Sequence, residues 1–357
     1  MSRFKLPDIS IITGIVLGGG AVILTLFGNP VNSGICISCF LENLAGALQL
    51  QDSLRMSYIR PELVGFLLGA FVMAKQSRRF HVTGGSSPLI RFLLGFFMIV
   101  GCGVFIGCPI KMMLRLGAGD LTAVAALLGM LFGIWLGGKY IRAGSVLERA
   151  QKLPTINGYV LPGIGFLLLL FLFIQPSFIR QGFSGPAAQH APLWMSLTVG
   201  LLIGGLAQRS GLCITGGIRN FFMFREKTLF SGVLALFGSA LLVSLVTGQF
   251  HLGMETQPGA HHSHLWSFLA MVLVGLAAVI VDGCPFRQVI KAGQGDVDAG
   301  ITCFGMVIGA ATVVTWQMRS SSAGPVFNGQ IATLLGLIFC LTVLLSYRLA
   351  GNQNKKS

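Results

Sequence analysis

Long apolar stretches, separated by short polar segments, recur along the whole chain. A helix needs about 20 mostly apolar residues to cross the ~30 Å hydrocarbon core of a bilayer. Stretches that approach this length lie at roughly 9–27, 61–74, 89–106, 121–141, 159–175, 194–207, 229–247, 265–281, 301–316 and 331–349. The pattern therefore predicts an all-α polytopic membrane protein with about ten spans.

The composition agrees with a bilayer as the surrounding medium. Hydrophobic residues make up 54% of the chain and charged residues 10%, whereas a soluble domain carries about 25% charged residues. The formal net charge is +14, but the basic residues lie in short loops and no soluble basic domain carries them. Nucleic acid is therefore not an expected partner.

The distribution of the basic residues predicts the topology. Alternate loops and the two ends hold most of them: Arg3, Lys5, Lys75, Arg78, Arg79, Arg142, Arg149, Lys152, Arg219, Arg225, Lys227, Arg348, Lys355 and Lys356. The other loops hold few, namely Arg55, Arg60, Arg180 and Arg319. Because cytoplasmic loops are enriched in Lys and Arg, both termini are expected in the cytoplasm.

Two cysteine-centred motifs each occur twice. Residues 107–120 read GCPIKMMLRLGAGD and residues 283–296 read GCPFRQVIKAGQGD, an offset of 284 − 108 = 176. SGICISCFLEN from Ser33 matches SGLCITGGIRN from Ser210, an offset of 213 − 36 = 177. Equivalent places are held by Cys36, Cys108, Cys213 and Cys284. In a membrane chain, this duplication predicts one central site built from both repeats.

The duplication also predicts the domain organisation. We expect two membrane repeats, residues 1–155 and 156–357, that form one transport domain, with the junction at the basic stretch before Pro154. Five spans in each half is an odd number, so the second half enters the membrane from the opposite side as an inverted repeat. Glycines at small-xxx-small spacing, such as Gly14 and Gly18, predict close helix packing.

Each GCP motif predicts a short half-helix between two spans. Pro109 suits the first helical turn, and the glycines Gly117 and Gly119 end the helix. A half-helix at membrane depth must be buried in protein or line a water-filled cavity.

Each half-helix should present a thiol and two cations on one face. Lys111 and Arg115 follow Cys108 at i+3 and i+7, and Arg287 and Lys291 repeat this spacing after Cys284. Free N–H groups and the helix dipole favour an anion at such an N-terminus. The four cations are candidate substrate-binding groups, although they would also suit anchoring of the half-helices at the membrane interface.

The SGxC motifs contribute further polar groups. Asn43 and Asn220 offer amide hydrogen bonds to a substrate, and Ser38 and Thr215 offer hydroxyl groups. These side chains complete the predicted central site.

Three acidic residues flank the half-helices. Asp120 and Asp296 are expected to cap the following span or to neutralise a nearby cation. Asp282 is expected to form a salt bridge with Arg287 or Lys291, with proton carriage as the alternative.

Neither a metal nor a cofactor is expected. Cys36 and Cys39 form a CxxC motif, which can indicate redox chemistry or metal binding, but the second copy has Gly216 in place of the second cysteine. Four histidines between His251 and His264 share one loop and leave metal capture open. A nucleotide motif is missing, which argues against ATP-driven transport by this chain alone.

Together, the duplicated GCP and SGxC motifs resemble the YeeE/YedE family of bacterial inner-membrane sulfur transporters over nearly the full length. The resemblance implies an hourglass of transmembrane helices with short helices that dip to the centre. It also implies that a few central cysteines pass thiosulfate along through transient thiol hydrogen bonds. On this sequence these are Cys36, Cys108 and Cys284, with Cys213 at the fourth equivalent position. The chain is most similar to the branch associated with selenium metabolism.

The expected function is therefore import of a small sulfur or selenium species, with no enzymatic activity. A cytoplasmic sulfur-carrier protein is a further candidate partner, because the basic loops would permit docking. The main alternative is a membrane thiol–disulfide relay, in which Cys36–Cys213 or Cys108–Cys284 pairs carry reducing equivalents. A purely structural membrane subunit is a third alternative.

Overall fold

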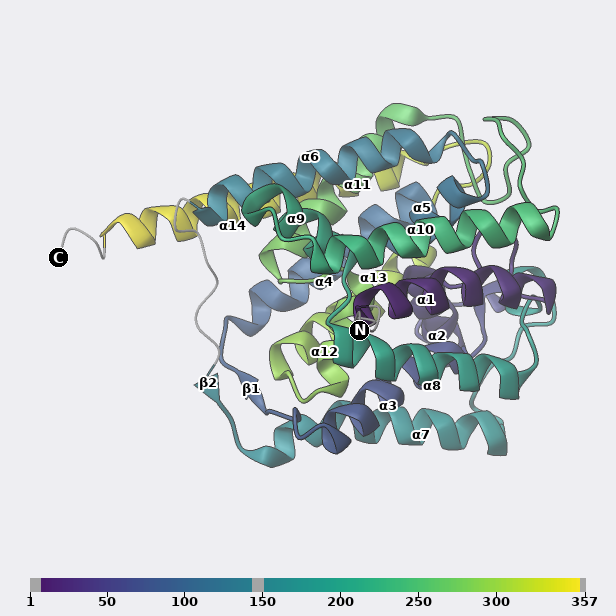
Figure 1. The fold of residues 1–357 in the computed structure, drawn as a ribbon, viewed down its shortest axis with the longest axis horizontal. Helices are drawn as coiled ribbons and strands as arrows, with labels where there is room; N and C mark the ends of the chain where they lie inside the picture. Colours follow the sequence, from purple (N-terminus) through teal and green to yellow (C-terminus); the bar gives the residue numbers. More distant parts are fainter. Residues whose placement is uncertain (1–7, 143–150, 354–357) are drawn as a thin grey trace, which may run out of the picture.

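The computed structural model describes residues 8–142 and 151–353, which fold into a bundle of helices (Figure 1). Among the basic residues used to predict the topology, Arg3, Lys5, Arg149, Lys355 and Lys356 lie outside the described residues. The described part holds 10 candidate spans that are long and apolar enough to cross a membrane. The prediction of an all-α polytopic membrane protein is confirmed.

The long helices agree with the predicted spans to within four residues at each end. They are α1 (Ile9–Leu26), α3 (Pro61–Gln76), α4 (Pro88–Phe105), α6 (Ala123–Arg142), α7 (Val160–Ile174), α8 (Leu193–Ser210), α10 (Thr228–Val246), α11 (His264–Ile280), α13 (Val297–Thr315) and α14 (Phe327–Gln353). Two short strands, β1 (Thr83–Gly84) and β2 (Gln151–Lys152), pair antiparallel in the loops. Three 3-10 turns lie at Leu54–Met56, Thr155–Tyr159 and Gly185–Ala187.

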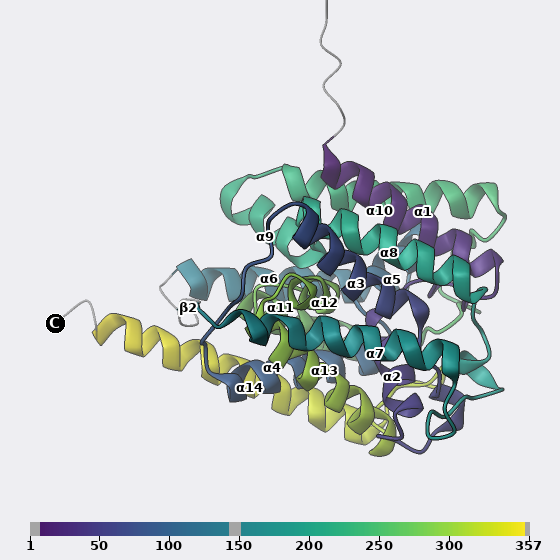
Figure 2. The ribbon, with the colours of Figure 1, turned by 90° about the horizontal axis from the view of Figure 1, so that it is seen from below.

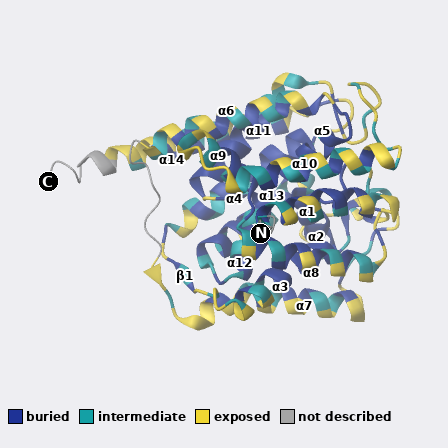
Figure 3. Cartoon of the chain, in the orientation of Figure 1, coloured by how far each residue is buried: buried dark blue, intermediate teal, exposed yellow. Residues whose placement is uncertain are grey.

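Four short helices lie between long ones along the chain. They are α2 (Ile37–Ala47), α5 (Pro109–Gly117), α9 (Ile214–Phe224) and α12 (Pro285–Gly293). The predictions for α5 and α12 are confirmed, including Pro109 in the first turn and the end of α5 at Gly117. The sequence did not predict α2 and α9 as helices. Figure 3 shows buried residues concentrated on the inner helices, whereas the outer helices carry the exposed positions.

Two of the spans are broken helices. Only residues 106–108 separate α4 from α5, and the chain turns there because Ile106 adopts the left-handed conformation with φ 64°. At the equivalent position of the second half (282 − 106 = 176), Asp282 has φ 58° and separates α11 from α12. A left-handed conformation is an outlier for a β-branched residue such as isoleucine. The packing around Ile106 therefore stabilises this unfavourable backbone conformation, and the residue at each helix break has a similar positive φ.

The helices of the two halves correspond at the spacing of the sequence motifs. α9 begins and ends 177 residues after α2 (214 − 37 and 224 − 47), and α12 begins and ends 176 residues after α5 (285 − 109 and 293 − 117). Among the long helices, α1 corresponds to α8 and α4 to α11. The members of both pairs run antiparallel to each other. For example, Thr13 Oγ1 of α1 contacts Leu206 O of α8, and a Cβ on Gly20 would meet Val199.

Helices from different halves pack side by side in parallel. In α1 and α10, a Cβ on Gly14 would overlap the carbonyl oxygen of Gly232. The corresponding pair is α3 and α8, in which a Cβ on Gly65 would approach Gly200 to 2.8 Å. Backbones that approach this closely require glycine at the contact, so the predicted role of the small-xxx-small glycines is confirmed at these positions.

The helices α7 and α14 lie at the margin of the bundle. α7 is the lowest helix in Figure 1 and packs on α3, and α14 runs along the lower edge of Figure 2 and packs on α4 and α11. A boundary at residue 155 would leave four candidate spans before it and six after it. Two sets of five require a boundary between α7 and α8 instead. The division into two inverted repeats stays a prediction.

Candidate functional site

Each of the four repeat-related cysteines is the N-cap residue of a half-helix. Cys36 caps α2, Cys108 caps α5, Cys213 caps α9 and Cys284 caps α12, and all four have extended backbone conformations. Their exposed fractions are 5% or less. In both Figure 1 and Figure 2, α2 and α5 lie to the right of centre and α9 and α12 to the left. Four positive helix ends are thus buried with a thiol at each.

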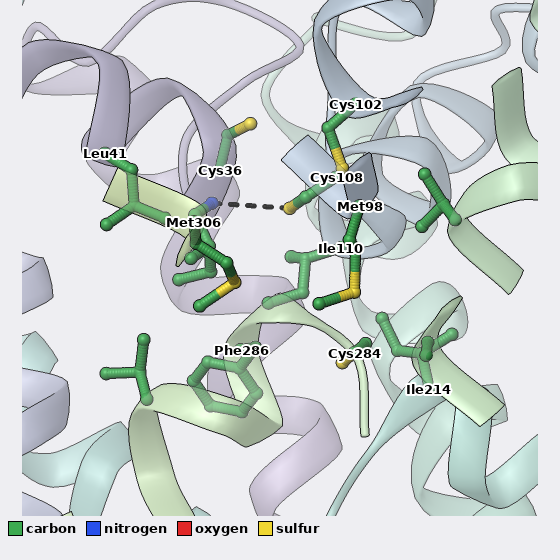
Figure 4. Packing of buried hydrophobic residues seen from close by; sticks show 14 of the residues in the cluster. Cys36, Leu41, Met98, Cys102, Cys108, Ile110, Ile214, Cys284, Phe286 and Met306 are labelled. Carbon is green, nitrogen blue, oxygen red and sulfur yellow. Dashed lines mark hydrogen bonds between the residues drawn. The ribbon is translucent and has the colours of Figure 1, made fainter. Parts of the chain in front are cut away.

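The first cysteine pair, Cys36 and Cys108, joins α2 to α5. The backbone N–H of Ile37 donates to Cys108 Sγ over 3.3 Å, the contact that Figure 4 marks with a dashed line. Cys36 Sγ lies 3.3 Å from Ser38 Oγ. The thiol that caps α5 therefore also accepts a hydrogen bond from the first turn of α2.

The second cysteine pair, Cys213 and Cys284, joins α9 to α12. The two sulfur atoms lie 3.7 Å apart, and the backbone N–H of Cys284 donates to Cys213 Sγ over 3.5 Å. Gly216 N donates to the same sulfur over 3.3 Å. All the cysteines of the described residues are free thiols.

A thin apolar layer separates the two pairs. In Figure 4 the side chains of Met98 and Ile110 lie between Cys108 and Cys284, with Phe286 and Met306 beside them. All four side chains are buried. The layer keeps the two thiol pairs apart without placing a charge between them.

The cations of α5 have different surroundings. The Lys111 side chain is buried, and its ammonium points toward Gly259, whose Cβ position lies 3.0 Å from Nζ. The ion pairs of the described residues do not include Lys111. Arg115, in contrast, binds Asp120 over 2.6 Å and Thr122 over 2.6 Å. Asp120 therefore neutralises a cation as expected, and Arg115 has the contacts of an anchor.

The cations of α12 form part of a charge network. Lys291 lies 3.5 Å from Asp282 and 3.4 Å from Asp296, and Arg219 of α9 lies 2.8 Å from Asp282. Arg287 donates to the carbonyl of Ala207 over 3.5 Å. The expected salt bridge between Asp282 and Lys291 is confirmed, and Arg219 is a partner that the sequence did not predict. Asp296 also caps α13 by accepting from Ala299 N over 2.9 Å.

A pocket of about 150 Å³ opens beside the second cysteine pair. Its polar lining comes from Cys213, Thr215, Arg219, Asp282 and Arg287. The basic residues of α9 and α12 and of the end of α9 are Arg219, Arg225, Arg287 and Lys291. We call the part of the protein that these two helices form the basic side.

The two asparagines are engaged elsewhere. Asn43 Nδ2 donates to Cys39 O over 2.7 Å, while its buried Oδ1 has no partner among the described residues. Asn220 donates to Glu226 over 2.9 Å and accepts from Arg219 over 3.3 Å. The structure thus places Asn220 at the far end of α9, away from its cysteine cap.

Residues 209–353, which include the second cysteine pair, match the family model described as "Sulphur transport". A stretch of 162 residues is 24% identical to the thiosulfate transporter TsuA of Escherichia coli (strain K12). These matches support the resemblance to the YeeE/YedE family over this part of the chain, and the assignment to the selenium branch stays a prediction. Both the family and this relative are named for transport rather than catalysis. The match covers 41% of this chain and 45% of TsuA, so the chain spans less than half the length of the curated relative.

One charged residue near the first cysteine pair was missed in the sequence. Glu42 of α2 is 1% exposed, and its Oε2 lies 3.0 Å from Arg319 Nε. Its position corresponds to Arg219 of α9 (219 − 42 = 177). The signal in the sequence was that Glu42 is the one charged residue of the motif at 33–43.

The histidine loop does not form a metal centre in the described part of the chain. No group of three or more His, Cys, Asp or Glu side chains there is arranged to hold a metal ion. His261 is buried and bonds through Nε2 to Val104 O over 2.9 Å. It fixes the loop to the end of α4.

Proposed function

We propose that this protein carries a small sulfur-containing anion of the thiosulfate type across a membrane, along a path that passes both cysteine pairs. The observation that carries the proposal is the placement of Cys36, Cys108, Cys213 and Cys284 at the buried N-termini of four half-helices. The match of residues 209–353 to a sulphur-transport family supports it.

The physical argument is the dehydration of the anion. An anion that leaves water loses strong hydration, and four helix N-termini, each equivalent to about half a positive charge, offset part of that cost. Thiols donate only weak hydrogen bonds. They give several shallow sites, which are favourable enough for the anion to enter and weak enough for it to leave.

We further propose that Lys111 attracts the anion at the first cysteine pair and Arg287 at the second. Lys111 is buried without an ion pair among the described residues, and Arg287 lines the pocket beside Cys213. Arg115 and Lys291 have acidic partners, which favours an anchoring role for both.

The antiparallel course of the equivalent helices α1 and α8 supports two inverted repeats. In such a protein, substrate sites lie at the interface of the repeats, near the middle of the bilayer. We propose a bacterial inner membrane as the location, with both termini in the cytoplasm. On this topology the basic side faces the cytoplasm, where a sulfur-carrier protein would receive the cargo.

The test is uptake of labelled thiosulfate and labelled selenite, measured side by side in a host that lacks its own sulfur-oxyanion importers. Wild-type protein is compared with Cys284→Ala. Thiosulfate uptake that depends on Cys284 supports the proposal. Uptake of the selenium species alone would place the chain in the selenium branch, and uptake of neither would contradict transport of both anions.

A second candidate function is a thiol–disulfide relay, which the 3.7 Å contact between the Cys213 and Cys284 sulfur atoms favours. In a relay these two thiols give two electrons and two protons to an acceptor and regain them from a donor. Thiol labelling of growing cells distinguishes the two functions. A Cys213–Cys284 disulfide that forms and disappears with the redox state of the cell would support the relay.

A further inference from the structure

We propose that the pocket beside Cys213 is a second anion site, in which Thr215, Arg219 and Arg287 bind the oxyanion end of the cargo and Asp282 competes with it for Arg219. This inference rests on the proposed function and extends the site at the second cysteine pair by further ligands and by a residue that promotes release of the cargo.

The first observation is an unsatisfied hydroxyl group. Thr215 is 1% exposed, its Oγ1 has no hydrogen-bond partner among the described residues, and it lines the pocket. A buried polar group without a partner costs about 1–3 kcal/mol. In the first half, the equivalent Ser38 has Cys36 Sγ as its partner at 3.3 Å. An oxyanion in the pocket would accept a hydrogen bond from Thr215.

The second observation is the balance of charge around the pocket. Arg219 and Arg287 line it, and the carboxylate in the lining is that of Asp282. Asp282 is bound to Arg219 over 2.8 Å and to Lys291 over 3.5 Å, and its side chain is 63% exposed. The cations thus outnumber the carboxylate, so the pocket favours an anion.

These contacts make Asp282 a resident competitor for the cargo. A sulfur oxyanion and a carboxylate offer an arginine the same kind of acceptor oxygens. When the cargo binds Arg219, Asp282 keeps Lys291 as its partner. When Asp282 returns to Arg219, the cargo loses one cation and is released.

The pair of a competing carboxylate and an arginine occurs in the second half and not at the equivalent positions of the first half. The position equivalent to Asp282 is Ile106, and the position equivalent to Arg219 is Glu42. The first half therefore has neither the competing carboxylate at the helix break nor the cation on the companion half-helix. The two ends of the path should differ in affinity for the same anion.

The experiment uses the purified full-length protein. Thiosulfate binding is measured by calorimetry in detergent, and thiosulfate flux is measured in proteoliposomes. The variants are Thr215→Val, Arg219→Gln and Asp282→Asn, since asparagine tolerates the left-handed backbone at this position. Arg209→Gln, which removes an exposed cation of α8 that is not part of the pocket lining, is the matched control.

We expect Thr215→Val and Arg219→Gln to raise the Kd for thiosulfate, by about threefold and about tenfold respectively. Asp282→Asn should lower the Kd at least about threefold and slow turnover, because release loses its competitor. Arg209→Gln should behave as wild type. Thermal unfolding of each variant tests whether a change in Kd or turnover comes from loss of the folded structure.

Two outcomes would overturn the inference, and they are distinguishable. If the wild type transports thiosulfate and both Thr215→Val and Asp282→Asn keep its affinity and turnover, the second site is wrong and the proposed function stands. If the wild type neither binds nor transports thiosulfate, the proposed function itself fails, and the site fails with it.

Discussion

Glu42 of α2 and Arg219 of α9 occupy the same position of two equivalent half-helices, each six residues after its cysteine cap (42 − 36 and 219 − 213). Each belongs to an ion pair with a residue from another segment. Glu42 lies 3.0 Å from Arg319, and Arg219 lies 2.8 Å from Asp282. The charged position on the half-helix is common to both halves, whereas the sign of the charge is opposite and the partners come from non-equivalent positions.

The Glu42–Arg319 pair should hold α2 in place. Glu42→Gln leaves the arginine without its partner, and we expect a loss of about 1–3 kcal/mol in the free energy of unfolding. The measurement is thermal unfolding of the detergent-solubilised protein. The double variant Glu42→Arg with Arg319→Glu should recover part of the loss. The single variants Glu42→Arg and Arg319→Glu are measured as well. If the destabilisation of the double variant equals the sum of theirs, the ion pair does not stabilise the protein.

Cys108 should be needed for transport but not for insertion. In Cys108→Ala the methyl group cannot take part in a thiol hydrogen bond, so we expect thiosulfate uptake to fall at least tenfold while the amount in the membrane is unchanged. The control is Cys340→Ala in α14, a buried thiol outside the two pairs. Equal uptake by both variants would remove Cys108 from the path.

The two cations of α5 should give opposite phenotypes. Arg115→Gln leaves the buried carboxylate of Asp120 without its counter-charge, which costs about 3–5 kcal/mol, so the protein should unfold at a markedly lower temperature. Lys111→Gln should keep the thermal stability and reduce uptake of the anion. The comparison needs one melting curve and one flux measurement per variant. A stable but inactive Arg115→Gln protein would instead make Arg115 a substrate ligand.

The contact between α1 and α10 should tolerate no added methyl group. In Gly14→Ala the new Cβ would overlap the carbonyl oxygen of Gly232, and forced repacking of this kind costs about 1–3 kcal/mol. Gly238→Ala on α10 is the control, because a Cβ there meets nothing within 4 Å. The melting temperatures of the two variants are measured in detergent. Only Gly14→Ala should melt at a lower temperature than the wild type.

The histidine loop should make stability depend on pH. His261 donates from Nε2 to Val104 O and accepts at Nδ1 from Ser263 N over 3.2 Å. Burial lowers the pKa of His261 below its ordinary value of 6.5, because the charged form is disfavoured. The folded protein therefore prefers neutral His261. This contribution to stability is present above about pH 6.5 and is lost as the pH falls through the lowered pKa.

A comparison of melting temperatures from pH 7.5 to pH 5 tests this prediction. The wild type should lose more stability on acidification than His261→Gln, which has no imidazole to protonate. Parallel curves for the two proteins would show that acid destabilises the fold through other groups.

The sequence predicted those half-helices that ordinary helix signals mark. Pro109 and Gly117 punctuate α5, and the same signals recur in α12. α2 and α9 were missed because neither begins with a proline, and cysteine is not a usual N-cap residue. The SGxC motifs were interpreted as part of the substrate site, and the structure shows that they also begin α2 and α9.

The pairing of side chains was less predictable than the elements. Duplication suggested disulfide partners across the halves, Cys36 with Cys213, but the structure brings Cys36 next to Cys108. The spacing placed Arg115 on the same face as Lys111, yet α5 ends at Gly117 and the chain returns Asp120 to Arg115. Contacts between residues as distant as Glu42 and Arg319 depend on the assembled fold.

The four cysteine-capped helix ends have an electrical consequence. At about half a positive charge each, they offer roughly one charge at each cysteine pair and two along the whole path, so an anion can move between the pairs without a counter-ion. A dianion that crosses alone carries its charge against the negative interior of a cell, at a cost of about 4.6 kcal/mol for 100 mV. At equilibrium the free anion would then be more than a thousandfold more dilute inside than outside. Import through such a path continues only while a reaction in the cytoplasm consumes the arriving anion or cations travel with it.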